Sequence, residues 1–351
     1  MSPPEQRGAM TSVRPSVAPV LLRYGATALV AFALFGLILA ISGKDPIASY
    51  RDILASTLGS TYGLSEVIVT MTPLLLTALA VAIPSRVGLI NVGGEGQLIM
   101  GACLSTWAAL TFAGLPAWLL LPIMALLGMI GGAAWAWIPG QLRARGLVNE
   151  TISTLLLNPV AALIASFLIF GYWHSPMDTN KTAVFSESAR LPRLLDTRID
   201  LGLIMGLALL ALFWYIMRST RWGLEMRALG GNPVAARLNG LPARRYTIVA
   251  LCLGGAVAGL AGMAMVSGYY GALLANFSRG VGFLGFLVCW LAGGSALGIV
   301  VTSFVVSIIL AGGNLLQLTR DVPYSTINIL LAITLFAVLA RPDFTRLRSA
   351  R

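Results

Sequence analysis

A polar, glycine-rich stretch interrupts an otherwise apolar chain at residues 88–101, which read GLINVGGEGQLIMG. Asn91, Glu95 and Gln97 would be costly in hydrocarbon unless they face protein or a water-filled path. Amide side chains both donate and accept hydrogen bonds, so they suit an uncharged, hydroxylated solute. The stretch therefore predicts part of a path by which a solute crosses a bilayer. The alternative is an ordinary turn between two spans, with Glu95 solvated.

A second polar segment, VNETISTLLLN at residues 148–158, adds Asn149, Glu150 and Asn158 to the predicted path. Asn149 and Glu150 precede an apolar run, and the favoured alternative is that they cap the helix that follows. Glu95 also has a structural alternative, in which its carboxylate caps the broken backbone of its own stretch.

The composition identifies a polytopic membrane protein. Of 351 residues, 57% are hydrophobic and 11% are charged, whereas soluble domains carry roughly 25% charged residues. The three cysteines lie in apolar segments without CxxC spacing, so we expect neither a metal site nor a disulfide. The net charge of +11 comes mostly from arginines at the ends of apolar segments. This pattern sets membrane topology, so we expect contact with the lipid bilayer and not with nucleic acid.

We expect one all-α transmembrane domain over residues 24–340, with cytoplasmic tails at 1–23 and 341–351. Apolar runs of bilayer-spanning length predict ten spans. They cover 24–42, 64–83, 88–111, 116–138, 148–170, 201–217, 247–267 and 324–340, and the remaining run, 281–311, is divided into two.

The charges predict the orientation of the spans. Sixteen of the 24 Lys and Arg residues lie on the side that holds both termini, which predicts cytoplasmic termini. We expect an external loop at 171–200, with one or two short helices and enough positive charge to bind an acidic partner. Residues 44–63 are predicted to form either an amphipathic surface helix or a plain connecting loop.

The predicted cytoplasmic loop 218–246 contains RALGGNPVAARLNG at residues 227–240. Asn232 suits a helix N-cap and Pro233 a first helical position, so we expect a short helix from Pro233 to Asn239 that ends before Gly240. Such a helix would suit docking to a partner protein. The alternative is a solvated connector whose arginines only hold the topology.

The run at 227–240 resembles the cytoplasmic coupling loop of ABC-importer permeases of the ribose, branched-chain amino acid and nucleoside group. Residues 88–97 are similar to the signature of the nucleoside and simple-sugar branch, and 149–158 and 280–285 look like further stretches of that branch. The matches keep a consistent order over about residues 60–340. Two features depart from the pattern: Val234 stands where relatives usually carry an acid, and the uncharged turn 293–298 is shorter than usual.

The resemblance implies a permease subunit without catalysis or a cofactor of its own, in a bacterial cytoplasmic membrane. Its partners would be an ATP-hydrolysing subunit, a second permease subunit in a heterodimer and an extracytoplasmic substrate-binding protein. The sequence has no GxxxxGK[ST] phosphate-binding loop, which agrees with ATP being bound by a partner. The residues that would couple the permease to the ATPase are Arg227, Gly230, Asn232, Pro233, Ala235, Ala236, Arg237 and Gly240.

The expected mechanism is alternating access with a nucleoside as solute, because the path offers amides and hydroxyls with few charges. A simple sugar is the alternative solute. An ion-coupled secondary transporter is the alternative mechanism, since such proteins also use broken helices with polar groups near the middle of the membrane. It would have less use for a docking loop at 227–240.

Overall fold

The computed structural model describes residues 33–34, 36–37, 39–41, 43–175, 178–194, 197–320, 329 and 332–333. The chain divides into two units, Met1–Ser49 with Pro323–Arg351 and Tyr50–Val322. Both predicted tails, and most of the predicted spans 24–42 and 324–340, lie outside the described residues. In the first unit, the described residues between 33 and 41 are helical. The second unit carries both predicted sites.

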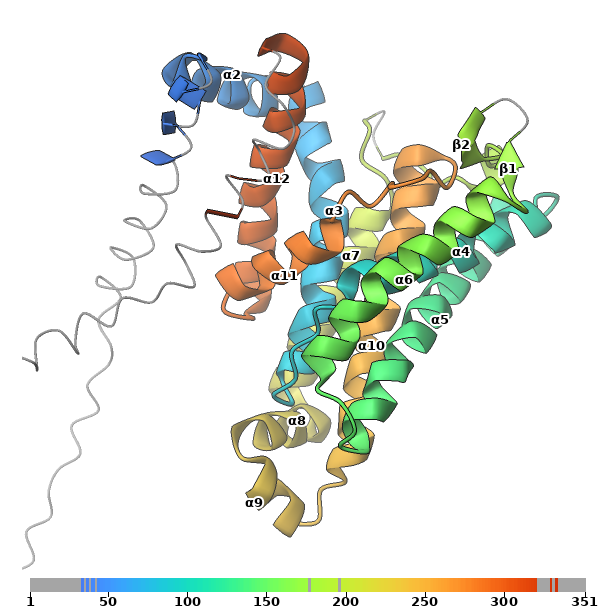
Figure 1. The fold of residues 1–351 in the computed structure, drawn as a ribbon, viewed down its shortest axis with the longest axis vertical. Coiled ribbons are helices and arrows are strands. Elements are labelled where there is room, and N and C mark those ends of the chain that lie inside the picture. Colours follow the sequence, from blue (N-terminus) through green and yellow to red (C-terminus); the bar gives the residue numbers. More distant parts are fainter. Residues whose placement is uncertain are drawn as a thin grey trace, which may run out of the picture. The chain divides into compact units, whose positions relative to one another are not determined.

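The second unit is almost entirely helical, which confirms the all-α prediction (Figure 1). Six helices among the described residues are long and apolar enough to cross a membrane. The elements are α2 (Pro46–Leu58), α3 (Thr61–Ser85), α4 (Gly94–Thr111), α5 (Ala117–Ala144), α6 (Glu150–Phe170), α7 (Gly202–Ser219), α8 (Arg221–Gly231), α9 (Pro233–Leu238), α10 (Ala243–Ala264), its π-helical continuation η2 (Met265–Tyr270), α11 (Val281–Leu291) and α12 (Ala296–Arg320).

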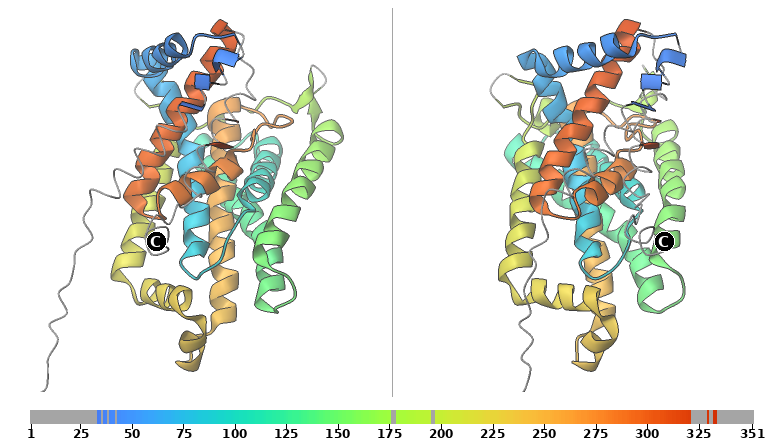
Figure 2. Two further views of the ribbon diagram at one scale, coloured as in Figure 1. Left: turned by 60° about the vertical axis from the view of Figure 1, so that its left-hand side comes forward. Right: turned by 90° about the vertical axis from the view of Figure 1, so that its left-hand side faces the viewer.

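Helices α3 and α10 form the centre of this unit. In their most apolar 18-residue windows, 89% of the α3 residues and 78% of the α10–η2 residues are buried, against 28% in each of α5 and α7. Helices α6 and α7 lie on opposite sides of α10 (Figure 2). A helix that is hydrophobic on all sides belongs inside a bundle, whereas α5, α6 and α7 present apolar faces outward.

Helices α4, α5 and α10 approach one another closely through glycines. A Cβ atom on Gly132 or Gly259 would overlap the backbone of the facing helix. Gly128 and Gly132 are four residues apart in α5, as are Gly255 and Gly259 in α10, so small residues line one face of each helix. This spacing lets the two backbones pack tightly without any polar group.

Two predicted segments differ from, or refine, the sequence expectation. The loop 171–200, which was predicted to be external, contains an antiparallel hairpin, β1 (His174–Ser175) and β2 (Asp178–Thr182), and one 3₁₀ turn, η1 (Glu187–Ala189), rather than short helices alone. Residues 46–58 form helix α2 and not a plain loop, because Asp45 accepts hydrogen bonds from the first free backbone N–H groups, those of Ile47 and Ala48. Its place at a membrane surface stays a prediction.

Candidate functional site

The glycine-rich stretch is a true break between two helices. Helix α3 ends at Ser85, a turn follows, and residues 89–92 have no regular secondary structure before α4 begins at Gly94. We call residues 88–93 the broken segment. Its backbone groups need partners where the segment is buried, at Leu89, Asn91 and Gly93.

One face of α6 supplies partners for the broken segment. Glu150, Thr154 and Asn158 are four residues apart, so their side chains line the same side of the helix. They accept hydrogen bonds from three backbone N–H groups, and Asn158 also donates to a carbonyl. The contacts are Ile90 N to Glu150 Oε1 (3.3 Å), Val92 N to Thr154 Oγ1 (3.3 Å), Gly96 N to Asn158 Oδ1 (2.9 Å) and Asn158 Nδ2 to Val92 O (2.9 Å).

Asn91 and Gln97 hold each other across the break. Each side-chain amide donates to the other's oxygen at 3.0 Å. Asn91 also donates to the carbonyl of Ala80 at 3.3 Å and accepts from the N–H of Gly93 at 3.0 Å. Both side chains are buried. This pair therefore satisfies its own polar groups, and a contact between it and a solute stays a prediction.

Glu95 joins the start of α4 to the start of α11. Its carboxylate accepts hydrogen bonds from Ser278 Oγ at 2.5 Å, Gly280 N at 3.2 Å and Gly282 N at 2.7 Å. It thus caps backbone some 185 residues away, and not the backbone of its own stretch. The N-termini of two helices meet here, and the partial positive charge at each favours a carboxylate between them.

A cavity of about 360 Å³ opens beside Glu95, between α4, α6 and the loop 274–283. We call it the α4–α6 cavity. Its size falls within the range of ligand pockets, about 300–1,000 Å³. Its polar lining residues include Glu95, Asn158, Asn276 and Arg279, and its apolar ones include Ile99, Ala162, Ile169, Phe277 and Phe283.

The loop that closes the cavity has an unusual backbone. Asn276 has φ of 57° and Arg279 has φ of 46°, a left-handed conformation that is uncommon for residues other than glycine. Such conformations cost of order 1–3 kcal/mol and persist where the surroundings hold them, often at functional sites. The hydrogen bonds from Ser278 and Gly280 to Glu95 are part of what holds this loop.

The six residues predicted for the solute path fall into separate roles. Glu95 and Asn158 line the cavity. Asn149 is the N-cap of α6 and accepts from Thr151 N at 2.8 Å, as its structural alternative predicted. Glu150 is buried in the first turn of α6 and pairs with Arg143 at 3.0 Å. The sequence did not show that the loop 274–283 would close the cavity.

The short helix predicted at 233–239 is confirmed as α9, and its coupling role stays a prediction. Asn232 caps it by accepting from Val234 N at 3.1 Å and Ala235 N at 3.0 Å, and Pro233 occupies the first turn. The helix ends at Leu238, and Gly240 follows with φ of 82°. Sequence reasoning missed α8 before it, although Thr220 offered a capping signal and does accept from Gly223 N at 3.2 Å.

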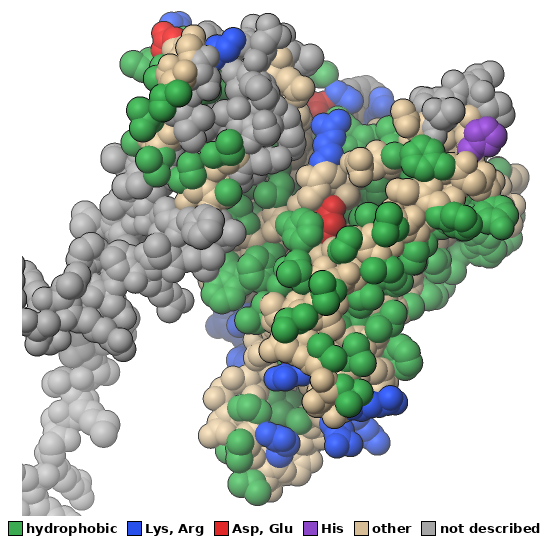
Figure 3. All heavy atoms as spheres, in the orientation of Figure 1, with side chains coloured by type: hydrophobic (Ala, Val, Ile, Leu, Met, Phe, Trp, Pro, Cys, Tyr) green, Lys and Arg blue, Asp and Glu red, His purple; other side chains and the backbone are tan. Residues whose placement is uncertain are grey.

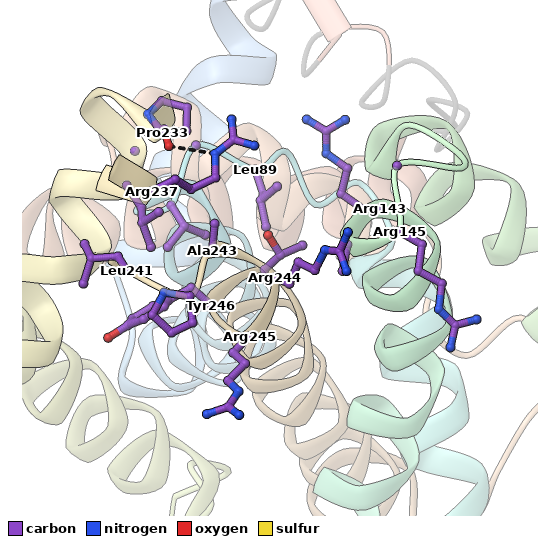
Figure 4. Close-up of a pocket in the computed structure, with 18 of the residues that line it drawn as sticks. Leu89, Arg143, Arg145, Pro233, Arg237, Leu241, Ala243, Arg244, Arg245 and Tyr246 are labelled. Carbon is purple, nitrogen blue, oxygen red and sulfur yellow. Dashed lines mark hydrogen bonds between the residues drawn. The ribbon is translucent and has the colours of Figure 1, made fainter. Parts of the chain in front are cut away.

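The other predicted coupling residues lie on or beside α8 and α9. Arg227 of α8 donates to the carbonyl of Met217 at the end of α7. In α9, Arg237 Nε donates to the carbonyl of Pro233 at 3.0 Å (Figure 4). The side chain of Ala236 is buried. Their contact with an ATPase subunit stays a prediction.

A broad groove of about 900 Å³ lies between α9, the end of α5 and the start of α10. Five arginines line it, and Figure 4 shows their side chains pointing in different directions around it: Arg143, Arg145, Arg237, Arg244 and Arg245. Lys and Arg side chains gather at this end of the unit, whereas hydrophobic side chains cover the helices above it (Figure 3). We call this end, with α8 and α9, the basic end.

Comparison with known proteins places this architecture in a family. Residues 63–339 match the family described as branched-chain amino acid transport system / permease component. The chain is 35% identical to the glucose ABC transporter permease protein TsgB13 of Haloferax volcanii, over 94% of this chain and 90% of that protein. It is 33% identical to the nucleoside ABC transporter permease protein NupB of Lactococcus lactis, over 88% of each chain. It is also 33% identical to the guanosine ABC transporter permease protein NupP of Bacillus subtilis, over 86% of this chain and 88% of that protein.

The fold is also similar to a solved membrane structure. PsaBC from Streptococcus pneumoniae, in complex with Fab, superposes with a TM-score of 0.51 at 14% identity, covering 87% of this chain and 100% of that one. At this identity the likeness concerns the fold alone. The chain belongs to the branched-chain amino acid transport system permease family, and is a multi-pass membrane protein that serves as the permease component, and not the ATPase, of an ABC import system.

Proposed function

We propose that this chain forms the solute pathway of an ATP-driven nucleoside importer and that the α4–α6 cavity receives the solute. The observation that supports this most is the meeting of two helix N-termini at Glu95, directly beside the cavity. Broken helices whose ends meet at a polar cavity are a recurrent way of building solute sites in membrane transporters. Glu95 and Asn158 are among the polar residues that line this site, and Asn91 and Gln97 stabilise the broken segment.

The lining of the cavity favours a nucleoside over a hexose. Ile99, Phe277 and Phe283 give it apolar walls, and Glu95, Asn158, Asn276 and Arg279 are among its polar lining residues. A nucleobase has two apolar faces, so it can pack against such walls. The ribose of the nucleoside can then hydrogen-bond to the polar lining residues. A hexose carries hydroxyls around its ring, and each hydroxyl buried without a partner costs free energy.

Simple sugars are the second candidate. The 35% identity to the glucose permease TsgB13, over 94% of this chain, supports a sugar as solute. The permeases NupB and NupP, each 33% identical, carry nucleoside and guanosine in their names. A direct comparison of uptake is therefore the decisive experiment.

The basic end is proposed to face the cytoplasm, together with both termini, in the cytoplasmic membrane. Positively charged residues concentrate on the cytoplasmic side of membrane proteins, and the groove beside α9 holds five arginines. In this arrangement α8 and α9 dock onto an ATPase subunit, and a second permease subunit completes the pathway. The loop 171–200 then faces an extracytoplasmic binding protein.

Uptake by the reconstituted importer tests this function. The chain would be assembled in liposomes with the ATPase, permease and binding-protein subunits encoded in the neighbouring coding regions. Labelled guanosine or labelled glucose would then be supplied. We expect guanosine uptake that requires ATP inside the liposomes and persists when ion gradients are dissipated. Glucose uptake without guanosine uptake would replace the nucleoside proposal by the sugar candidate. Uptake that ignores ATP and follows an ion gradient would contradict the importer mechanism.

A further inference from the structure

We infer that α8 acts on the α4–α6 cavity through one backbone contact, in which Gly230 of α8 packs against residues 86–88. This inference rests on the proposed docking of the basic end onto an ATPase subunit, and it specifies how movement there reaches the cavity. The contact lies at the start of the broken segment, far along the chain from α8.

The contact leaves no room for a side chain. A Cβ atom on Gly230 would overlap the carbonyl oxygen of Arg86 and lie 3.1 Å from its carbonyl carbon and 3.3 Å from Gly88 N. A Cβ atom on Gly88, whose φ is 78°, would lie 3.6 Å from the Cα and carbonyl oxygen of Gly230. Close-packed backbone has little compressibility, so a shift of α8 displaces the turn at Gly88 directly.

From Gly88 the shift continues along the broken segment to the cavity. Its next residues are fixed to α6 by the hydrogen bonds from Ile90, Val92 and Gly96. Asn158, which receives Gly96 N, lines the cavity, as does Glu95. The route from Gly88 to Glu95 runs along the backbone, and the side chains of α6 that accept these hydrogen bonds hold it in place.

A second route leaves the same contact through Arg86. Its guanidinium donates to the carbonyl of Gly294, in the turn between α11 and α12, and lies 5.4 Å from the centre of the Phe213 ring of α7. The other end of α11 begins at the backbone that Glu95 binds, since Gly282 N donates to its carboxylate. Arg86 and Glu95 therefore hold opposite ends of α11. Both routes converge on Glu95.

Two neighbouring glycines allow a matched test. Gly230 and Gly231 are the last two residues of α8, and a Cβ atom on Gly231 would meet no described atom within 4 Å. Gly230→Ala and Gly231→Ala therefore make the same change in helix propensity, but Gly230→Ala alone forces residues 86–88 to move. The variants would be compared in the complete importer in liposomes, with ATP hydrolysis and solute uptake measured together.

We expect Gly231→Ala to keep the wild-type solute uptake per ATP hydrolysed. Gly230→Ala should keep its ATPase activity while solute uptake per ATP falls by about 5- to 150-fold. This range corresponds to the coupling free energies of about 1–3 kcal/mol that are typical between two sites. A purely structural defect would lower both rates together by lowering the amount of assembled importer. Wild-type uptake per ATP in Gly230→Ala would overturn the inference.

A measurement on the wild type decides the matter if Gly230→Ala fails to assemble. Hydrogen exchange of the peptide containing residues 88–96 would be followed in the importer without nucleotide and with ATP trapped by vanadate. The inference expects exchange in this peptide to change between the two states, and unchanged exchange would overturn it. Failure of the proposed function is distinguishable, because the wild-type importer would then show no ATP-driven uptake of guanosine or glucose.

Discussion

Replacing Glu95 by glutamine tests the junction between α4 and α11. The glutamine side chain has the same length, but it carries one acceptor oxygen and one amino group where the carboxylate has two acceptors. The carboxylate accepts from Ser278 Oγ, Gly280 N and Gly282 N. With the glutamine oxygen facing Ser278 and Gly280, its amino group must face the N–H of Gly282, so one hydrogen bond is lost.

The size of the effect follows from these three bonds. A hydrogen bond to a charged group contributes about 1.5–3 kcal/mol net and a neutral one about 0.5–1.5 kcal/mol. Two retained bonds each weaken by about 1 kcal/mol, and the third loses about 2 kcal/mol. The attachment of the loop before α11 should therefore weaken by about 4 kcal/mol. Because each 1.4 kcal/mol changes an equilibrium constant tenfold, the equilibrium constant for local opening should rise about 100- to 1,000-fold.

Hydrogen exchange of the purified protein in detergent measures this opening. We expect the peptide containing Gly280 and Gly282 to exchange about 100- to 1,000-fold faster in Glu95→Gln, since exchange of protected amides follows the local opening free energy. A change below about tenfold in this peptide, under 1.4 kcal/mol, would refute the reasoning.

The chain offers a matched control for the loss of one negative charge. Glu66 near the start of α3 forms an ion pair with Arg198, and the side chains of the pair are 23% and 40% exposed. Solvent-exposed pairs contribute about 0–1 kcal/mol. Glu66→Gln should therefore leave exchange in the loop before α11 unchanged and lower the melting temperature only slightly.

Three further changes have calculable outcomes. Asn158→Leu leaves Gly96 N and Val92 O without their partners, which costs about 1–3 kcal/mol of stability each, so the melting temperature in detergent should fall clearly. Asn158→Asp keeps an acceptor for Gly96 N, so it should lose about half as much stability. Burial raises the pKa of Asp200 from 3.8 to about 6, so wild-type stability should fall by about 2 kcal/mol as pH rises from 4 to 6. Asp200→Asn should lack this fall. If the difference in melting temperature between wild type and Asp200→Asn is the same at pH 4.5 and at pH 7.5, this prediction is contradicted. Asn232→Ala removes both hydrogen bonds that cap the N-terminus of α9, which should destabilise this helix by about 1 kcal/mol. Faster hydrogen exchange confined to α9 would show this loss.

The features that the sequence predicted are those that depend on local signals. The helix at 233–238 has its cap, its proline and its terminating glycine within a few residues, so its limits could be stated within one residue. The apolar runs that became α3, α5 and α6 were predicted to within about three to six residues at their ends, because hydropathy alone defines a span.

The features that were missed depend on contacts between distant parts of the chain. A contact between Glu95 and solute stays a prediction, and the backbone that Glu95 caps lies not in its own stretch but at the start of α11 and in the loop before it. The pairing of Asn91 with Gln97 requires the backbone to turn between them, and residue types alone do not show this. The hairpin at 174–182 lies in a polar loop with no alternation of apolar residues, so period-two patterning could not identify it.

Filling the α4–α6 cavity tests the central claim most directly. Ala162 lines the cavity, and its neighbour Leu163 is 70% exposed on the outer face of α6. The importer containing Ala162→Trp or Leu163→Trp would be reconstituted in liposomes, and ATP-dependent uptake of labelled guanosine would be measured beside ATP hydrolysis. We predict that Ala162→Trp abolishes uptake while ATP hydrolysis continues and that Leu163→Trp transports like the wild type. Wild-type uptake by Ala162→Trp would show that the solute does not pass through this cavity.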